Sequence, residues 1–159
     1  MTEREYQNRI SEYTPALYRI AHTVLLNSHD CADAVQEAIF QGWLKRNQLR
    51  DESRFKAWIA RIVINECRNL QRKTQKQLRV VGAMIDDFRS APQQAPKTAL
   101  EAAVSELPEK YRVPIILYYS ENYSTREIAQ IMDIPEGRLR ERMRTARKML
   151  GRALGNESE

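Results

Sequence analysis

Residues 123–150 read YSTREIAQIMDIPEGRLRERMRTARKML, and this stretch carries the clearest structural pattern in the C-terminal part of the chain. Ser124 and Glu127 have the spacing of a capping box, which opens a short helix. Residues 133–135 form a turn, and a longer helix follows. The apolar stripe of that longer helix consists of Leu139, Met143, Ala146 and Leu150. A capped short helix, a tight turn and a long basic helix predict a helix-turn-helix.

The outward face of the long helix carries cations that suit DNA. Its polar residues point sideways or away from the apolar stripe: Arg138, Arg140, Glu141, Arg144, Thr145 and Lys148. Basic side chains bind phosphates, and arginine also reads guanine edges. Glu141, at the centre of this face, would either accept a hydrogen bond from a cytosine amino group or only orient a neighbouring arginine. The alternative to DNA binding is a solvated basic helix.

Positive charge is concentrated in two blocks of the chain. The 159 residues carry a net charge of +5, but residues 45–73 and residues 138–152 each carry +6. The remaining residues therefore carry −7. Two basic blocks on an otherwise acidic body predict two separate contacts with a polyanion.

Composition excludes several classes of protein. Cys31 and Cys67 are the two cysteines, so we expect no disulfide framework and a reducing, cytoplasmic compartment. The charged N-terminus lacks the apolar segment of a secretory signal, and no apolar run approaches the ~20 residues of a membrane span. We therefore expect no membrane insertion. Neither a P-loop nor GxGxxG occurs, and His22 and His29 match no standard zinc spacing. We expect no cofactor, no metal and no enzymatic activity.

Three segments of the N-terminal half have apolar residues at helical spacing. The first covers residues 13–25, the second begins near Asp30, and the third follows Ser53, a candidate N-cap. Residues 62–64 are β-branched, but the longer stripe around them favours helix. We interpret Trp43 and Trp58, which lie on apolar stripes, as core residues.

These patterns predict an all-α chain with two small helical domains. Periodicity fades after residue 76 and resumes near Thr98, with prolines and glutamines between. We place an N-terminal helical bundle at residues 1–75, a flexible linker at 76–97 and a C-terminal helix-turn-helix bundle at 98–159. Pro108 is expected at the first position of a helix within the second bundle.

Two further stripes of polar residues lie on the predicted N-terminal helices. A basic stripe opposite the core face either binds nucleic acid or only solubilises the helix; it consists of Arg61, Asn65, Arg68 and Arg72. An acidic stripe, which DNA would repel, consists of Asp30, Asp33 and Glu37, with Gln36 beside it. The acidic stripe either meets a basic protein surface or stabilises the helix N-terminus through the helix dipole.

In this order and spacing, these blocks resemble the extracytoplasmic-function sigma factors of the sigma-70 family. The resemblance to region 2 lies in residues 17–21, 30–37 and 55–62 and in Asn65. The resemblance to region 4 lies in residues 107–112, 123–129 and 135–142. It extends over residues 17–72 and 107–150, which is 100 of 159 residues. The chain departs from the family pattern at Glu141 and at the turn, where Met132-Asp133-Ile134 replaces the commoner Leu-Gly-aliphatic sequence.

The resemblance implies a transcription initiation subunit that binds bacterial core RNA polymerase and promoter DNA. The polymerase contact, made with the clamp helices, is implied for Asp30, Asp33, Gln36 and Glu37. Melting of the −10 element and capture of a flipped base are implied for a loop and for the following helix. The side chains implied at this element are Arg50, Asp51, Glu52, Ser53, Arg54, Arg61, Asn65 and Arg68.

Recognition of the −35 element is implied for the helix-turn-helix. The side chains are Ser124, Thr125, Arg126, Arg138, Arg140, Glu141, Arg144, Thr145 and Lys148. The resemblance also implies an anti-sigma factor, which in this family is often membrane-bound. A stand-alone helix-turn-helix regulator is the alternative, but it leaves the acidic and second basic stripes unexplained together. A small nuclease would require clustered carboxylates or histidines, which the sequence lacks.

Overall fold

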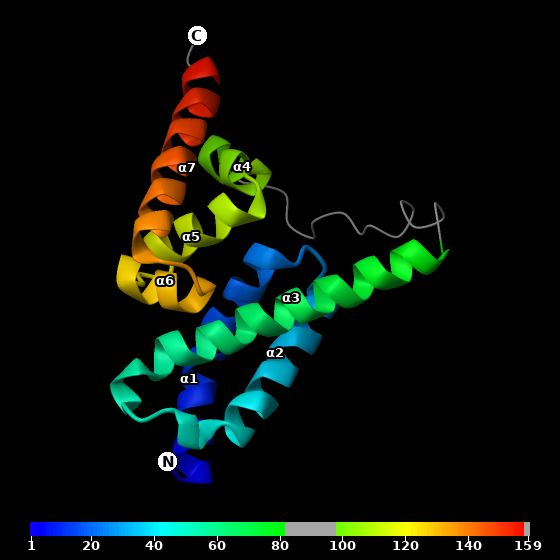
Figure 1. Cartoon of the computed structure of the whole chain (residues 1–159), viewed down its shortest axis with the longest axis vertical. Coiled ribbons are helices and arrows are strands. Elements are labelled where there is room, and N and C mark those ends of the chain that lie inside the picture. The colour runs from blue at the N-terminus through cyan, green and yellow to red at the C-terminus, as the bar shows by residue number, and fades with distance from the viewer. Residues whose placement is uncertain (82–97, 158–159) are drawn as a thin grey trace. The chain divides into compact units, whose positions relative to one another are not determined.

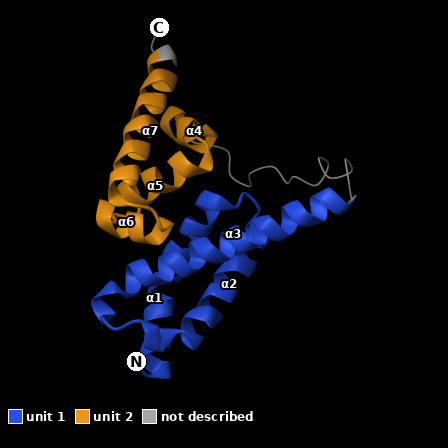
Figure 2. Ribbon diagram, viewed as in Figure 1, with its two compact units in different colours: residues 1–93 blue, residues 94–159 orange. Residues whose placement is uncertain are grey.

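The computed structural model describes residues 1–81 and 98–157, in which all regular structure is helical (Figure 1). The chain divides into two compact units, residues 1–93 and residues 94–159 (Figure 2). The prediction of an all-α fold with two helical parts is confirmed. Within the described ranges, no helix combines the length and the hydropathy that a membrane span requires.

The described part of unit 1, residues 1–81, contains three α-helices that each pack against the other two: α1 (Glu3–Val24), α2 (Ser28–Leu44) and α3 (Phe55–Val81). Two short 3-10 turns join α2 to α3: η1 (Arg46–Gln48) and η2 (Glu52–Arg54). A capping box between Thr2 and Glu5 opens α1. Helix α1 therefore begins ten residues before the apolar stripe that the sequence indicates, because its first turns are mostly exposed.

The core of unit 1 lies around α3. Ile62, Val63 and Ile64 are all buried, because α3 packs against α1 on one side and α2 on another. The run lies inside α3, so the prediction that it is helical is confirmed. Trp43 and Trp58 are half-buried and pack against an aromatic cluster, with ring centroids 5.4 Å from Tyr6 and 5.9 Å from Phe55, respectively. Both tryptophans are therefore packing residues of unit 1.

Gly42 lies on the buried side of α2, close to side chains of α1 and α3. A Cβ at this position would lie 2.6 Å from the Tyr6 hydroxyl and 2.9 Å from Cδ1 of Ile59. The same hydroxyl donates a hydrogen bond to the carbonyl oxygen of Ile39, at 2.5 Å. Glycine is therefore required for α1 and α3 to pack on α2 at this distance, and the contact fixes the rotation of α2 about its axis.

Helix α3 begins and ends at residues other than those expected. Ser53 is not its N-cap: Ser53 lies within η2, and its backbone N–H donates to Asp51 Oδ1 at 3.0 Å, so Asp51 caps η2, the turn that leads into α3. Residues 76–81, assigned to the linker from sequence, are helical. Their glutamine, lysine, leucine and arginine favour helix even where no apolar stripe is packed. The rest of the predicted linker, residues 82–97, lies outside the described residues.

Unit 2 is built around its last helix. Helix α7 (Glu136–Glu157) packs against three others: α4 (Ala99–Glu106), α5 (Glu109–Tyr119) and α6 (Thr125–Met132). Pro108 is the N-cap of α5 rather than its first helical residue, so the helix begins one residue later than expected. Pro114 lies inside α5 and is buried. Tyr118, in the last turn of this helix, is 37% exposed.

The predicted helix-turn-helix is present in α6 and α7. The capping box of Ser124 and Glu127 opens α6 as expected. Asp133 ends α6 in the left-handed conformation, with φ 56° and ψ 50°. The backbone N–H of Ile134 then donates a hydrogen bond to the Ala129 carbonyl oxygen at 3.0 Å, so this carbonyl at the end of the helix has a partner. The buried face of α7 consists of Leu139, Met143 and Ala146.

Candidate functional site

The acidic stripe lies on the outer side of α2. Asp33, Gln36 and Glu37 are exposed, and Asp30 is half-buried. The Asn27 side chain already caps α2, since it accepts from the backbone N–H groups of His29 and Asp30. Of the three residues of the acidic stripe, only Asp30 lies in the first turn. Because the effect of the helix dipole falls off within that turn, the dipole does not account for Asp33 and Glu37.

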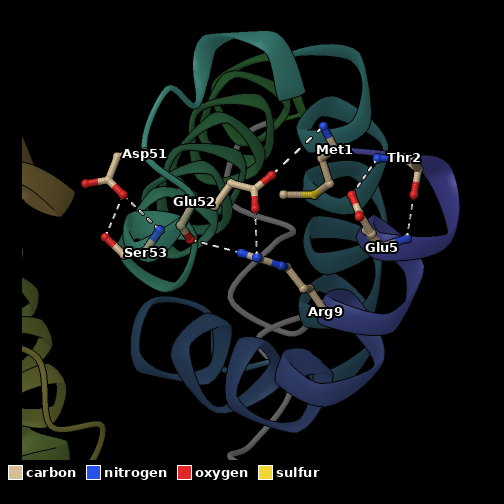
Figure 3. Close-up of polar contacts among 7 residues, drawn as sticks. All are labelled: Met1, Thr2, Glu5, Arg9, Asp51, Glu52 and Ser53. Atoms are coloured by element: carbon tan, nitrogen blue, oxygen red, sulfur yellow. Dashed lines mark hydrogen bonds and ion pairs between the residues drawn. The ribbon is translucent and has the colours of Figure 1, made fainter.

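The loop that is predicted to contact the −10 element is anchored to α1 (Figure 3). Arg9 donates from Nη1 to the Glu52 carbonyl oxygen at 2.9 Å and from Nη2 to Glu52 Oε2 at 3.1 Å. The Met1 amine lies 4.0 Å from Oε1 of the same carboxylate. Glu52 is thus held from α1 through its backbone and its side chain.

Asp51 shapes the same loop from within. Its Oδ1 accepts hydrogen bonds from Ser53 Oγ at 2.7 Å and from the Ser53 backbone N–H at 3.0 Å, and these bonds lower the pKa of Asp51. Arg54 lies 3.7 Å from Asp51 Oδ2, and Arg50 is exposed. The loop residues are therefore not equivalent: Asp51, Glu52 and Ser53 fix its conformation.

The basic stripe lies on α3, in the segment that follows this loop directly. Arg61, Asn65 and Arg72 are exposed, and Arg68 is half-buried. At 1.5 Å per residue, Asn65 lies about 15 Å along α3 from its first residue. The side chains predicted to act at the −10 element therefore belong to one unit but extend along a helix rather than gathering in a single cluster.

A cleft of about 490 Å³ lies between the N-terminal end of α6 and one side of α7. Its lining consists of Thr125, Arg140, Met143, Arg144, Arg147 and Lys148. The lining is strongly cationic and contains no carboxylate. Glu136, at the start of α7, accepts from Arg140 Nη2 at 2.9 Å and from Thr125 Oγ1 at 3.4 Å. Four of the side chains predicted to contact the −35 element thus come together here.

The other side chains predicted to contact the −35 element lie outside this cleft. Arg138, Glu141 and Thr145 are exposed on α7, Arg126 is exposed on α6, and Ser124 is the cap of α6. The carboxylate that orients Arg140 is Glu136 rather than Glu141. This pairing removes one reason to regard Glu141 as an orienting residue.

Arg147 belongs to the cleft but was not among the predicted residues. It lies four residues after the buried Met143, beside the apolar stripe, where sequence favours packing over DNA contact. Its Nε donates to the Tyr119 hydroxyl at 3.0 Å, and its guanidinium lies 5.8 Å from the centre of that ring. The +6 charge of residues 138–152 includes Arg147, but the contact with Tyr119 has no signal in sequence.

Neither cysteine forms a reactive or metal-binding group in the described residues. Cys31 and Cys67 are buried and form no disulfide, and burial raises the pKa of the Cys31 thiol to about 11. Within residues 1–81 and 98–157, no three His, Cys, Asp or Glu side chains gather as a metal site would require.

Comparison with known proteins gives two family matches in the order of the two units. The Sigma-70 region 2 family matches residues 9–77, and the Sigma-70, region 4 family matches residues 97–150. RNA polymerase sigma factor SigV of Bacillus subtilis is 29% identical over 143 residues, which cover 89% of this chain and 86% of that protein. The ECF RNA polymerase sigma-E factor of Haemophilus influenzae is 27% identical over 161 residues, 91% of this chain and 81% of that protein.

Solved structures share the fold. The sigma factor RpoE of Bartonella quintana, solved with the anti-sigma factor NepR, matches with a TM-score of 0.79 and 22% identity over 96% of this chain and 98% of that chain. CnrH, solved with the cytosolic domain of CnrY, matches with a TM-score of 0.69 and 21% identity over 98% of this chain and 90% of that chain. From the two family matches and the relatives, the chain belongs to the extracytoplasmic-function sigma factors of the sigma-70 family, which are specificity subunits of transcription initiation and not enzymes.

Proposed function

We propose that this sigma factor docks on core RNA polymerase through the acidic face of α2 and contacts promoter DNA through the cations of α3, α6 and α7. The separation of charge between the two surfaces supports the assignment of one to polymerase and of the other to DNA. Carboxylates occupy the exposed face of α2, whereas cations line α3 and the cleft beside α7. DNA phosphates repel the first surface and attract the second.

In this proposal, region 2 acts at the −10 element with two kinds of residue. Asp51 and Glu52 keep the loop in shape, since carboxylates gain nothing from contact with phosphates. The cations bind the backbone of the opened strand: Arg50, Arg54, Arg61 and Arg68. Asn65 pairs with a base edge, because its amide offers both a donor and an acceptor. Backbone contacts of this kind offset the few kcal/mol that unstacking a base costs.

Region 4 acts at the −35 element through α7. The cleft beside Thr125 receives a backbone phosphate, which the side chains of Arg140, Arg144 and Lys148 neutralise. Exposed residues of α7 then face the major groove, and Glu141 accepts a hydrogen bond from a cytosine amino group. The first helix, α6, contributes Ser124 and Arg126 near the phosphate backbone.

The same proposal assigns region 2 to residues 1–75, the linker to residues 76–97, of which residues 76–81 continue α3, and region 4 to residues 98–159. The protein acts in the cytoplasm, where core polymerase and promoter DNA are present. An anti-sigma factor controls it, as is supported by two similar folds that were each solved with a bound partner, NepR in one case and CnrY in the other.

Charge reversal on α2 tests the proposal. We expect Asp33→Lys with Glu37→Lys to abolish binding of the purified chain to core polymerase. The matched control is Glu12→Lys with Glu106→Lys, which makes the same change in net charge at exposed positions on α1 and α4. Equal polymerase affinity of the two double variants would contradict the proposal and favour the stand-alone regulator.

A further inference from the structure

The outer face of α2 is acidic only in its first half. Phe40 and Leu44, in the second half, are 54% and 55% exposed. Large apolar side chains at this exposure on a charged helix are a typical mark of a protein–protein contact when they continue an existing surface. The question is whether they belong to the same face as the carboxylates.

Helical spacing places all four side chains in one stripe. Asp33, Glu37, Phe40 and Leu44 follow one another at intervals of four, three and four residues. Residues three and four apart are neighbours on a helix surface. The same spacing is that of a seam along which one helix packs against another. The stripe therefore has the register of a helix-on-helix contact, acidic at its N-terminal half and apolar at its C-terminal half.

Unit 1 does not bury this stripe, and α2 is not free to rotate so that it would. The opposite side of α2 packs inward through Val35, Ala38 and Gly42. A rotation of α2 that buried the stripe would bring larger side chains to the place of Gly42, where even a Cβ would lie within 3 Å of Tyr6 and Ile59. Phe40 and Leu44 are therefore held outward by the packing of the bundle.

We propose that Phe40 and Leu44 form the second half of the polymerase-docking surface. The occupant is a helix of core RNA polymerase that is basic where it meets Asp33 and Glu37 and apolar where it meets Phe40 and Leu44. This inference rests on the proposed function of the acidic face and adds residues to it. It commits to polymerase because the apolar half is continuous with the acidic half, and because the exposed carboxylates of the acidic half attract a basic surface.

A second copy of the chain fits the same surface poorly. In a parallel pair of α2 helices, carboxylates would face carboxylates. In an antiparallel pair, Asp33 and Glu37 would face apolar side chains and lose water without gaining a cation. Charge complementarity therefore favours the basic partner.

The two halves contribute differently to binding. Exposed carboxylates speed the encounter with a basic surface, and salt screens this effect. Buried apolar side chains slow dissociation, and salt affects them little. The inference thus predicts a part of the polymerase affinity that persists at high ionic strength and depends on Phe40 and Leu44.

The test measures the affinity of the full chain for core polymerase at low and high salt. Phe40→Gln with Leu44→Gln keeps good helix formers at exposed positions, so the melting temperature stays that of the wild type. We expect affinity to fall at least about 10-fold at both salt concentrations, the effect of losing roughly one well-buried apolar side chain. Phe40→Met with Leu44→Met retains affinity. Val80→Gln, at a residue 82% exposed on α3, is the matched control and has no effect.

Other results of the same experiment distinguish a failure of this inference from a failure of the proposed function. If Asp33→Lys with Glu37→Lys weakens binding and the glutamine variant does not, the inference is overturned and the proposed function stands. If neither variant weakens binding, the proposed function fails and the inference fails with it. If the glutamine variant changes only self-association of the chain, measured by sedimentation, the occupant is a second copy and the inference is wrong.

Discussion

Arg9 of α1 binds both the backbone and the side chain of Glu52, although the two residues are 43 positions apart. The contact joins the helix at the start of the chain to the loop that is proposed to act at the −10 element. The guanidinium also lies 5.5 Å from the centre of the Phe55 ring, the first residue of α3. Arg9 is thus a positioning residue for the loop, while any contact with DNA is left to the loop itself.

Removal of Arg9 tests this role. We expect Arg9→Met to slow promoter opening about five-fold, since the two partly exposed contacts together are worth about 1 kcal/mol. Glu52→Gln has a smaller effect, because the backbone carbonyl still accepts from Arg9. Permanganate reactivity of unpaired thymines at the −10 element measures opening.

Binding of the Arg9→Met chain to core polymerase provides the control measurement and is expected to be unchanged. Arg4→Met removes an exposed cation from the same helix and is expected to open promoters normally. Equal opening by the Arg9 and Arg4 variants would show that the anchor has no part in melting.

Two glycines give opposite predictions for stability. Gly42→Ala is expected to destabilise unit 1 by about 1–3 kcal/mol, because the new Cβ meets Tyr6 and Ile59 inside a packed core. Gly137→Ala, where nothing lies within 4 Å of the new Cβ, stabilises unit 2 by up to about 1 kcal/mol. Urea denaturation measures the free energy of unfolding of both variants. Tryptophan fluorescence follows the unfolding of unit 1, which contains Trp43 and Trp58, and amide hydrogen exchange follows that of unit 2. A neutral Gly42→Ala variant would contradict the packing described around α2.

The sequence predicts those features that depend on local pattern. The capping box at Ser124 and the apolar stripe through Leu139 and Met143 specify α6 and α7 without reference to the rest of the chain. The extent of α1 and α3 is less visible, because their exposed ends have helix propensity and caps but few apolar residues.

Contacts between residues that lie far apart in the chain cannot be predicted from local sequence pattern. The Arg9–Glu52 anchor and the Arg147–Tyr119 hydrogen bond join residues 43 and 28 positions apart. Only the packing of helices brings such residues together, so no spacing rule indicates them. The same packing left Phe40 and Leu44 exposed, whereas an apolar residue on a helix is normally expected inside.

Arg147 is expected to contribute one phosphate contact in the complex of the sigma factor with core polymerase and promoter DNA. We expect Arg147→Gln to lower the slope of log affinity against log salt by about 0.9, the value for one neutralised phosphate. Tyr119→Phe keeps the charge and removes the acceptor, so affinity falls less and the slope is unchanged. Arg152→Gln, further along α7, is the matched control. A wild-type slope in the Arg147 variant would exclude Arg147 from the interface.

The Cys31 thiol makes the stability of unit 1 depend on alkaline pH. Burial, with a smaller effect of Asp30, raises its pKa from 9.0 to about 11. Between these values the unfolded chain loses the proton and the folded chain keeps it, so stability is full below pH 9.0 and falls as the pH rises toward 11. We expect Cys31→Ala to give a shallower decline in urea midpoints over this range. His22→Ala, at an exposed residue of α1, is the control and keeps the wild-type decline. The prediction fails if the Cys31 and His22 variants decline alike.

Transcription in vitro tests most directly whether the chain directs promoter-specific initiation. The purified chain is mixed with bacterial core polymerase free of other sigma factors and with a library of genomic fragments, and the 5′ ends of the RNA are sequenced. The account predicts discrete start sites that share −10 and −35 motifs upstream, and their loss with Asp33→Lys and Glu37→Lys. Start sites no different from those of core polymerase alone would contradict it.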